Sequence, residues 1–359
     1  MVKIKRKKII KEFVHFVPNL IYESQIANKL NATILPLVFT NEDHFPHSNA
    51  NIEWWYFTGV LETPLRKNKI GFEVTFFRFQ TIFEGRIIHT AITDIENKTF
   101  YNKELILPIA SESLFQKGNK GIISIFKNRV EFHDQLNSFK IKTEFKDLKI
   151  DLNLTINNLM HGGKDGILKM QNYQDDLSYY FSFPDLKTEG KVIFKDETLN
   201  VSGLTWHDHQ WGNFHIKNLK WDWFSLRFDE DDIYIMIFNF RRKGREITTG
   251  NFYKNPKNIQ LENIRITAKK TFKTKDGVEY PLNWEIEIPG GKNINLSMKF
   301  NVFPLIDGQH ISSFITHSYW EGICQVEGKI TENYEQEDKV LFEKKSLKGT
   351  AYVELTGYE

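Results

Sequence analysis

Cysteine is nearly absent from this 359-residue sequence: Cys324 stands alone, so no internal disulfide can form. A chain without disulfides suits a reducing compartment, and we expect a cytoplasmic protein. Apolar runs stay short of the ~18 residues needed to cross a bilayer, which predicts no membrane-spanning segment. The lysine-rich start is followed by a run that is broken by charges and lacks a small-residue cleavage site, so we expect no signal peptide.

The sequence also lacks an excess of charge of either sign. It holds 48 basic and 46 acidic residues, a formal net charge of +2, which predicts no nucleic-acid partner. Aromatic residues are plentiful instead, at 14% of the chain with 30 phenylalanines. Such residues favour strands and apolar cavities over helical bundles.

Short runs rich in Ile, Phe, Thr and Tyr, separated by turn residues, predict two series of β-strands. The first series comprises residues 70–80, 85–94, 122–126, 138–145, 149–156 and 179–183. The second comprises residues 220–228, 234–241, 248–253, 259–267, 283–287, 294–300, 319–330 and 349–356. Short strands at this spacing are typical of sandwiches and barrels, so we predict an all-β protein whose two β halves join near residues 205 to 218.

One of these strands is apolar on both of its faces. Within residues 220–228, Trp221 and Trp223 share one face while Phe224, Leu226 and Phe228 share the other. Such a strand either lines a cavity or packs against a neighbouring domain, and the sequence leaves both open.

Residues 1–35 differ from the rest of the chain, because a basic start leads into apolar residues at mixed helical spacing. The favoured interpretation is a short helical extension that caps the main body. Peripheral contact with an anionic membrane surface is the alternative. We therefore divide the chain into this extension, a first domain of residues 36–212 and a second domain of residues 213–359.

Histidine and tryptophan concentrate in residues 205–212 and 221–225, and again around residues 44–57. Burying so many indole and imidazole groups is costly unless each N–H finds an acceptor, which indicates a ligand site or an unusually polar core. We favour the ligand site. His207 and His209 present two imidazoles on one side of an extended segment, but residues 210–214 contain no acid, so we expect no metal.

Proton chemistry in an aromatic cavity is the reaction type that remains, since no Gly-x-Ser-x-Gly motif supports a hydrolase. Burial beside indoles raises the pKa of a carboxyl group, which then stays protonated and can donate to an alkene. Aromatic faces stabilise the resulting carbocation. The carboxyl candidates are Glu53, Asp94, Asp208 and Asp222. The alternative for each is a carboxylate that caps a turn or accepts an indole N–H.

A set of motifs runs in order through residues 53 to 358: Glu53–Gly59, Phe72–Arg78, His89–Asp94, Asp208–Gly212, Trp221–Ser225, Tyr319–Gly322 and Glu354–Tyr358. In these motifs the chain resembles the carotenoid hydratase and attachment-protein-like family of tandem lipocalin-like proteins. The resemblance implies two lipocalin-like β-barrel domains with a hydrophobic pocket at or near their interface. It also implies an enzyme, because relatives hydrate a carotenoid end group, cyclise isoprenoids by protonation or catalyse Diels–Alder ring closure.

Individual residues carry over from the family only in part. His209 and Trp211 match a His-x-Trp pair that is tied to activity in the hydratases. Their Tyr-x-Asp acid has no counterpart, because the corresponding strand, residues 234–240, contains no carboxylate. The resemblance therefore implies an acid elsewhere, and Asp94 is the first choice because it ends a strand of the first domain within a family motif.

We predict a cofactor-independent terpene (isoprenoid) cyclase that protonates an alkene of a hydrophobic isoprenoid or polyene in an aromatic pocket between the domains. A carotenoid-type hydratase and a non-catalytic lipocalin-like carrier are the alternatives. The predicted catalytic residues are Asp94, Glu53 and His209. The predicted substrate-binding residues are Trp55, Tyr56, His89, Trp206, Trp211, Trp223 and Tyr234.

Overall fold

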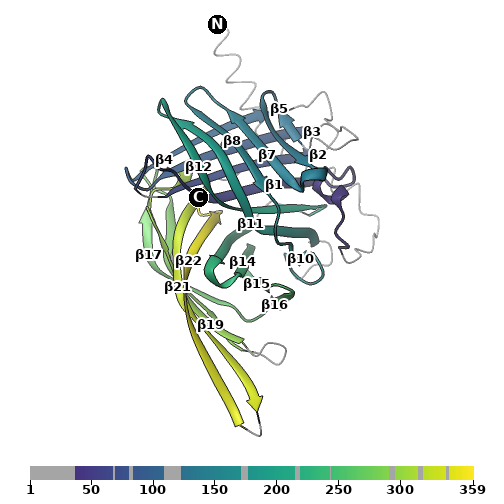
Figure 1. Cartoon of the computed structure of the whole chain (residues 1–359), viewed down its shortest axis with the longest axis vertical. Helices are drawn as coiled ribbons and strands as arrows, with labels where there is room; N and C mark the ends of the chain where they lie inside the picture. Colours follow the sequence, from purple (N-terminus) through teal and green to yellow (C-terminus); the bar gives the residue numbers. More distant parts are fainter. Residues whose placement is uncertain are drawn as a thin grey trace.

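The computed structural model describes residues 37–67, 69–80, 84–108, 123–170, 177–214, 219–242, 244–290, 296–313, 318–336 and 339–359. Within these ranges the chain is almost entirely β-strand, with three short 3₁₀ helices: η1 (Asn41–His44), η2 (Asp134–Leu136) and η3 (Asp229–Asp231). The strands pair antiparallel in two sheets, one for each half of the chain (Figure 1).

The first sheet has the strand order β4-β3-β2-β1-β12-β11-β8-β7-β6-β5, and β9 and β10 pair with β11. Its strands are β1 (Ile52–Glu62), β2 (Ile70–Gln80), β3 (Glu84–Asp94), β4 (Thr99–Leu107), β5 (Ile123–Ile125), β6 (Asn128–His133), β7 (Ser138–Glu144), β8 (Leu148–Thr155), β9 (Met160–His161), β10 (Ile167–Lys169), β11 (Leu177–Phe194) and β12 (Glu197–Gly212). The sheet curls so that its two ends approach each other: the Arg86 guanidinium in β3, the strand next to the edge strand β4, donates to the Ser124 carbonyl oxygen in β5 at 2.7 Å.

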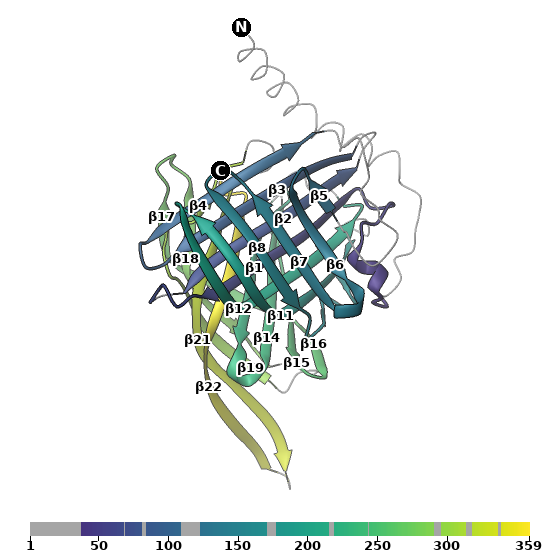
Figure 2. The same cartoon turned by 45° about the horizontal axis from the view of Figure 1, so that its top comes forward.

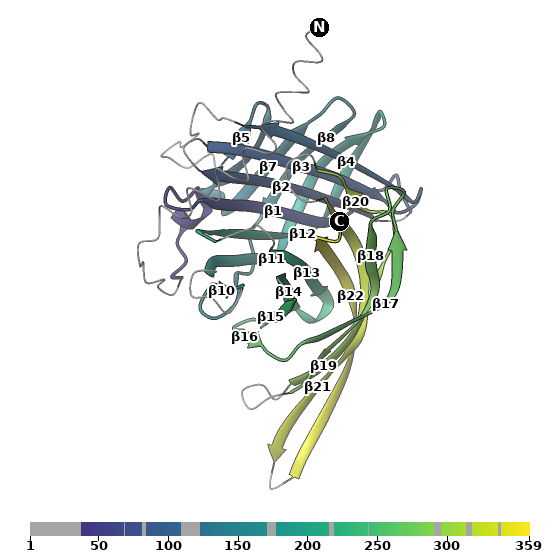
Figure 3. The same cartoon turned by 180° about the vertical axis from the view of Figure 1, so that it is seen from behind.

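The second sheet has the order β16-β15-β14-β13-β22-β21-β19-β18-β17, and β20 pairs with β21. Its strands are β13 (Lys220–Phe228), β14 (Ile233–Arg242), β15 (Arg245–Lys254), β16 (Lys257–Leu261), β17 (Arg265–Lys273), β18 (Glu279–Ile288), β19 (Leu296–Pro304), β20 (His310–Ile311), β21 (Tyr319–Gln336) and β22 (Lys339–Thr356). The long β21–β22 hairpin leaves the body on the side of this sheet (yellow in Figures 1 to 3).

Packed side chains fill the interior of each curled sheet. In the first interior the rings of Phe57 and Phe139 meet edge to face with their centroids 5.7 Å apart. In the second, Phe224 and Trp284 pack in the same way at 5.4 Å. Both interiors are therefore ordinary close-packed cores.

A third apolar core lies between the two sheets, and strand alternation builds it. Strand β1 turns Trp55 into the first interior and Tyr56 toward the second sheet. Strand β13 likewise turns Phe224 into the second interior and Trp223 toward the first sheet. The two-sided apolarity of residues 220–228 thus reflects one core face and one face packed against the neighbouring sheet.

The predicted all-β fold in two barrel-like sheets is confirmed. The expected junction at residues 205–218 is wrong in its first part, because residues 205–212 are the end of strand β12 and pair with β1 and β11. This strand escaped prediction because its buried faces carry imidazole, indole and carboxylate groups, which hide the apolar alternation.

The sheets change between Gly212 and Lys220, whereas the division into domains at residues 212 and 213 stays a prediction. The expected helical extension, residues 1–35, lies outside the described residues. In the described part of the chain we find no helix with the length and apolarity to cross a membrane.

Candidate active site between the two sheets

Strand β12 divides the histidine- and tryptophan-rich stretch between two places. Trp206 belongs to the core between the sheets, and Asp208, two residues on, lines a cavity there. His207 stacks on Phe57 and His209 on Trp55, both in the first interior. Neighbours in the sequence therefore belong to separate clusters, as the twofold alternation of a strand requires.

The cavity between the sheets has a volume of about 20 Å³, enough for one or two water molecules. Strands of both sheets form its wall, and most of that wall is aromatic: Trp54, Tyr56, Phe77, Tyr180, Trp221, Trp223 and Phe238. Besides the tyrosine hydroxyls, its polar lining consists of Thr75 and two carboxyl groups, Asp208 and Glu354. We call it the acid cavity.

Asp208 reaches the acid cavity from β12. Its Oδ1 accepts hydrogen bonds from the Ser182 hydroxyl and from the Trp206 indole N–H, both at 2.6 Å. Burial raises the pKa of Asp208 to about 7, although these hydrogen bonds oppose the shift by stabilising the charged form. Near neutral pH this group is divided between acid and carboxylate.

Glu354 reaches the same cavity from β22, in the other sheet. Its Oε2 accepts one hydrogen bond, from the Trp221 indole N–H at 2.9 Å. Burial raises the pKa of Glu354 to about 7, and the negative charge of Asp208 adds to the increase. Two carboxyl groups that oppose each other's ionisation hold about one proton between them at neutral pH.

Two further buried carboxyl groups, Glu321 and Glu73, accept hydrogen bonds from residues of the cavity wall. The Tyr56 hydroxyl donates to Glu321 Oε1 at 2.6 Å and so links β1 to β21, and the Thr75 hydroxyl donates to Glu73. Burial raises the pKa of Glu73 to about 8 and that of Glu321 well above its usual range, and Glu354 adds to both shifts. At neutral pH both groups are therefore largely neutral.

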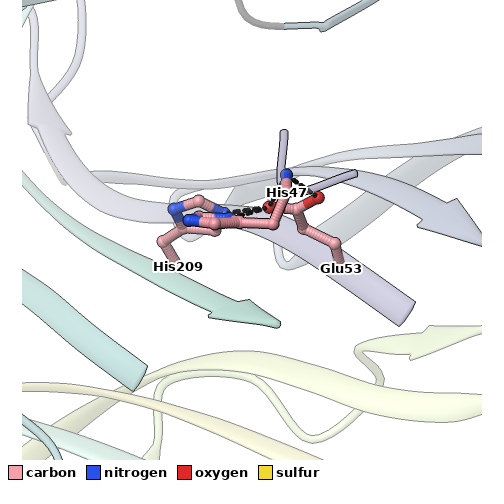
Figure 4. Close-up of side chains that lie close together, drawn as sticks. All are labelled: His47, Glu53 and His209. Carbon is pink, nitrogen blue, oxygen red and sulfur yellow. Dashed lines mark hydrogen bonds and ion pairs between the residues drawn. The ribbon is translucent and has the colours of Figure 1, made fainter. Parts of the chain in front are cut away.

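A different cluster surrounds Glu53 in the first sheet (Figure 4). His47 Nδ1 and His209 Nε2 lie 2.8 and 2.9 Å from the same oxygen, Glu53 Oε1. The Arg78 guanidinium donates to Oε2 at 3.1 Å. All of Glu53 and His209 is buried, so this carboxylate sits in a network of positive and hydrogen-bonding partners.

The charge state of this network follows from its contacts. Burial raises the pKa of Glu53, but hydrogen bonds from His209 and His47 outweigh it, so the pKa is lowered overall. Burial lowers the pKa of His47, but hydrogen bonds with Asp43 and Glu53 outweigh it and raise the value. Glu53 is thus an ionised partner and not the protonated acid that the sequence predicted.

His47, Glu53 and His209 are also the described residues that could hold a metal, since their ligand atoms lie within 4.8 Å of one another. His207 does not join them, because its Nδ1 lies 3.0 Å from the Tyr56 carbonyl oxygen. The fixed charge of Arg78 on Glu53 opposes a further cation at this place. We therefore interpret the cluster as structural, and the catalytic role of His209 stays a prediction.

A family model described as AttH-like matches residues 35–358 of the chain. The chain belongs to the AttH-like family. This confirms the resemblance seen in the sequence motifs. No curated protein matches the chain.

Solved structures show how far the AttH-like fold extends. A crystal structure assigned as an AttH of Nitrosomonas europaea is 24% identical, with a TM-score of 0.75 over 91% of this chain and 99% of the other. Kievitone hydratase of Nectria haematococca is 19% identical, with a TM-score of 0.70 over 89% and 93%. CghA with Sch210972 is 12% identical, with a TM-score of 0.56 over 90% and 94%.

Of the binding residues predicted for this AttH-like chain, four lie in the core between the sheets: Tyr56, Trp206, Trp223 and Tyr234. Tyr56 and Trp223 line the acid cavity and meet edge to face with centroids 5.1 Å apart. The Trp206 indole N–H donates a hydrogen bond to Asp208. Trp55 and Trp211 instead stack on the imidazoles around Glu53.

Two of the predicted binding residues, His89 and Tyr234, make polar contacts outside the acid-cavity lining. His89 Nδ1 lies 2.6 Å from the Tyr319 hydroxyl, and Nε2 lies 3.0 Å from Glu104. The Tyr234 hydroxyl donates to Asp185 at 3.3 Å.

Asp94, the predicted proton donor, lies at the end of β3 and caps the turn that follows. Its carboxylate accepts hydrogen bonds from the Asn97 backbone N–H at 3.1 Å and side-chain amide at 2.7 Å, and Arg66 lies 3.8 Å away. It does not line the acid cavity. The geometry supports the turn-capping alternative over a catalytic role.

Sequence reasoning missed Glu354, Glu73 and Glu321 as functional groups, although each stands in a family motif. Each is a lone acid among apolar residues of a strand, as in Gly71-Phe72-Glu73-Val74 and Tyr352-Val353-Glu354-Leu355. Such an acid is buried with its neighbours and has its pKa raised. That pattern was the available signal.

Proposed function

We propose that this AttH-like chain is an enzyme that transfers a proton to an alkene of a hydrophobic small molecule, with the acid cavity as its active site. The observation that carries the proposal is the pair of Asp208 and Glu354, whose pKa values lie near 7, at an aromatic wall. A general acid works best when its pKa lies near the working pH.

The hydrogen bonds of the two carboxyl groups suggest how they divide the work. Asp208 accepts from both Ser182 and Trp206, which favours its carboxylate form. Glu354 accepts one hydrogen bond, from Trp221, and lies near that negative charge. Glu354 is therefore the proton donor and Asp208 the base.

The walls of the acid cavity suit a cationic intermediate. The indoles of Trp54 and Trp221, from different sheets, lie nearly parallel with centroids 6.4 Å apart. Tyr56 and Trp223 add two more rings. A cation near such ring faces is stabilised by about 0.5–2 kcal/mol per contact.

Hydration is the reaction that the cavity supports best, because its volume suits a bound water molecule beside the Asp208 base. Glu354 gives its proton to one alkene carbon, and water adds its oxygen to the other. Asp208 takes the proton released from that water, so the product gains one water overall. A hydratase among the similar folds agrees with this chemistry.

Cyclisation of an isoprenoid is the second candidate, and the aromatic wall favours it. After the same protonation, an internal alkene in place of water would attack the cation, and Asp208 would remove a proton to end the reaction. Ligands of drug size occupy roughly 300–1,000 Å³, so either substrate enters only when the walls move apart. A carrier is less well supported, because side chains fill both sheet interiors.

Incubation with a panel of linear isoprenoids, polyenes and prenylated phenols, followed by mass spectrometry, tests the proposal. A product heavier by one water indicates hydration, and an isomer of unchanged mass indicates cyclisation. We expect Glu354→Gln to lower the rate about 10²-fold or more. Glu287→Gln, which removes a half-buried surface partner of Lys299 outside the acid-cavity lining, is the control and should keep the wild-type rate. Ligand binding without any product would favour the carrier.

A further inference from the structure

A second small cavity, of about 10 Å³, lies along the same interface. The strands that line the acid cavity continue into it, since β1 contributes Tyr56 to the first and Thr58 to the second. Strand β13 contributes Trp223 to the first and Arg227 to the second, on the same face of the strand. The two cavities therefore follow each other along one seam between the sheets.

The second cavity differs from the first because a buried cation lines it. The Arg227 side chain is only 6% exposed. Its Nε lies 3.0 Å from Asp229, and its terminal nitrogen donates to the Thr350 hydroxyl at 3.4 Å. A guanidinium has five N–H donors, more than these two contacts use.

The Thr58 hydroxyl gives a second, independent sign of a ligand. Thr58 is 1% exposed and lines this cavity, and its Oγ1 has no hydrogen-bond partner among the residues that the structure describes. Leaving a buried hydroxyl unpaired costs about 1–3 kcal/mol. An acceptor placed between Thr58 and Arg227 would remove that cost.

The spacing of the strands sets the distance between the two cavities. Trp223 and Arg227 are four residues apart on β13, which corresponds to about 13 Å at ~3.3 Å per residue. Trp221, which bonds to Glu354, lies two residues further on the same face. A molecule whose alkene lies near Glu354 would therefore reach Arg227 only if it is elongated.

We propose that the second cavity is a subsite for a carboxylate at the far end of an elongated, unsaturated substrate, an inference that rests on the proposed function. Arg227 would bind the carboxylate through its remaining N–H donors, and the Thr58 hydroxyl would donate to it. A carboxylate fits this place better than a diphosphate because it is the smaller anion, and a cavity that holds about one water molecule needs the smaller movement of its walls to admit it.

Two probes with the same C15 isoprenoid skeleton test this subsite: farnesoic acid, which carries a carboxylate, and farnesol, which carries a hydroxyl. Quenching of tryptophan fluorescence reports their binding. We expect the acid to bind wild type at least 10-fold more tightly than the alcohol. Arg227→Gln should abolish this preference, and Thr58→Val, which keeps the side-chain shape, should reduce it. Arg265→Gln removes an exposed arginine and should leave the preference unchanged.

Equal affinities of wild type for both probes, no binding of either probe, or an unchanged preference in both Arg227→Gln and Thr58→Val would each overturn the subsite. A thermal melt shows whether Arg227→Gln is folded, and Thr58→Val decides the question if it is not. Binding is measured without turnover, so the subsite and the reaction fail separately. A carboxylate preference with no product from any alkene would contradict the proposed reaction and leave the subsite standing.

Discussion

Asp208 and Glu354 have pKa values near 7 for the same cause, burial, but need opposite charge states in the proposed reaction. Activity should therefore follow a bell-shaped pH profile with its maximum near pH 7, because the base is lost below it and the acid above it. Measuring kcat between pH 5 and 9 checks this. A rate that stays level across this range would contradict the assignment of an acid and a base.

Glu73 makes the fold itself sensitive to pH. Its pKa is about 8 in the folded chain against an ordinary 4.5, so between these values the folded state holds a proton that the unfolded state has lost. Stability therefore falls as pH rises from about 4.5 to 8, by up to about 1.4 kcal/mol per unit. Glu73→Gln cannot ionise, so the variant should lack this fall in stability with rising pH.

Urea unfolding of wild type and Glu73→Gln at pH 5, 6.5 and 8 measures the effect of that side chain. Relative to wild type, the free energy of unfolding of the variant should increase at each step from pH 5 to 6.5 and from pH 6.5 to 8. The exposed Glu262→Gln serves as the control and should follow wild type. A difference between Glu73→Gln and wild type that stays constant with pH would rule out a neutral Glu73.

Arg78 tests the structural role of the cluster around Glu53. Arg78→Gln leaves a buried carboxylate without its fixed positive partner, and breaking such a pair costs about 3–5 kcal/mol. The double variant Glu53→Gln with Arg78→Gln should recover part of that loss, which urea unfolding can measure. A loss below about 1 kcal/mol, as expected for the exposed Arg265→Gln, would show that the pair is unimportant.

The sequence predicted which residue types form a site but not their charge states. Glu53 and Asp208 both stand beside tryptophans in the sequence, yet one is ionised and the other is partly neutral. Both carboxyl groups are buried, but hydrogen bonds from His209 and His47 lower the pKa of Glu53 overall, whereas burial outweighs the hydrogen bonds to Asp208, and only the fold brings these partners together. No local pattern contains that information.

At the scale of elements, strand β12 explains why the predicted site residues lie in two separate clusters. Asp208 and His209 are neighbours, but alternation sends one to the acid cavity and the other to the first interior. The alternation within residues 220–228 could be read from the sequence because both faces are apolar. In β12 it could not, because polar and aromatic groups occupy both faces.

The pairing of β1 with β12 positions Tyr56 opposite Asp208, and a glycine permits it. A Cβ on Gly203 would lie 2.1 Å from the Val60 carbonyl oxygen, so Gly203→Ala must push the two strands apart. We expect a loss of about 1–3 kcal/mol in urea unfolding, together with lower activity.

Gly308→Ala is the matched control, because its Cβ would meet only Phe272, at 3.8 Å. That variant should stay within about 0.5 kcal/mol of wild type. Equal stabilities of the two alanine variants would show that the close approach at Gly203 does not hold the strands in register.

At the scale of the whole molecule, the proposed active site exists only because two sheets meet. Each sheet fills its own interior, and each supplies one carboxyl group to the acid cavity, Asp208 from the first and Glu354 from the second. The all-β fold in two halves followed from strand patterns. The register of one half against the other did not, because it depends on contacts such as Tyr56 with Glu321, 265 positions apart.

Turnover in D₂O measures the proton transfer most directly. If Glu354 protonates an alkene carbon, the product of the wild-type enzyme carries one carbon-bound deuterium, and mass spectrometry detects it after exchangeable positions return to hydrogen. Glu354→Gln should still bind substrate, but it should form this product at a rate lowered about 10²-fold or more. Product without carbon-bound deuterium, or wild-type deuterium incorporation by Glu354→Gln, would contradict protonation by the interface acid.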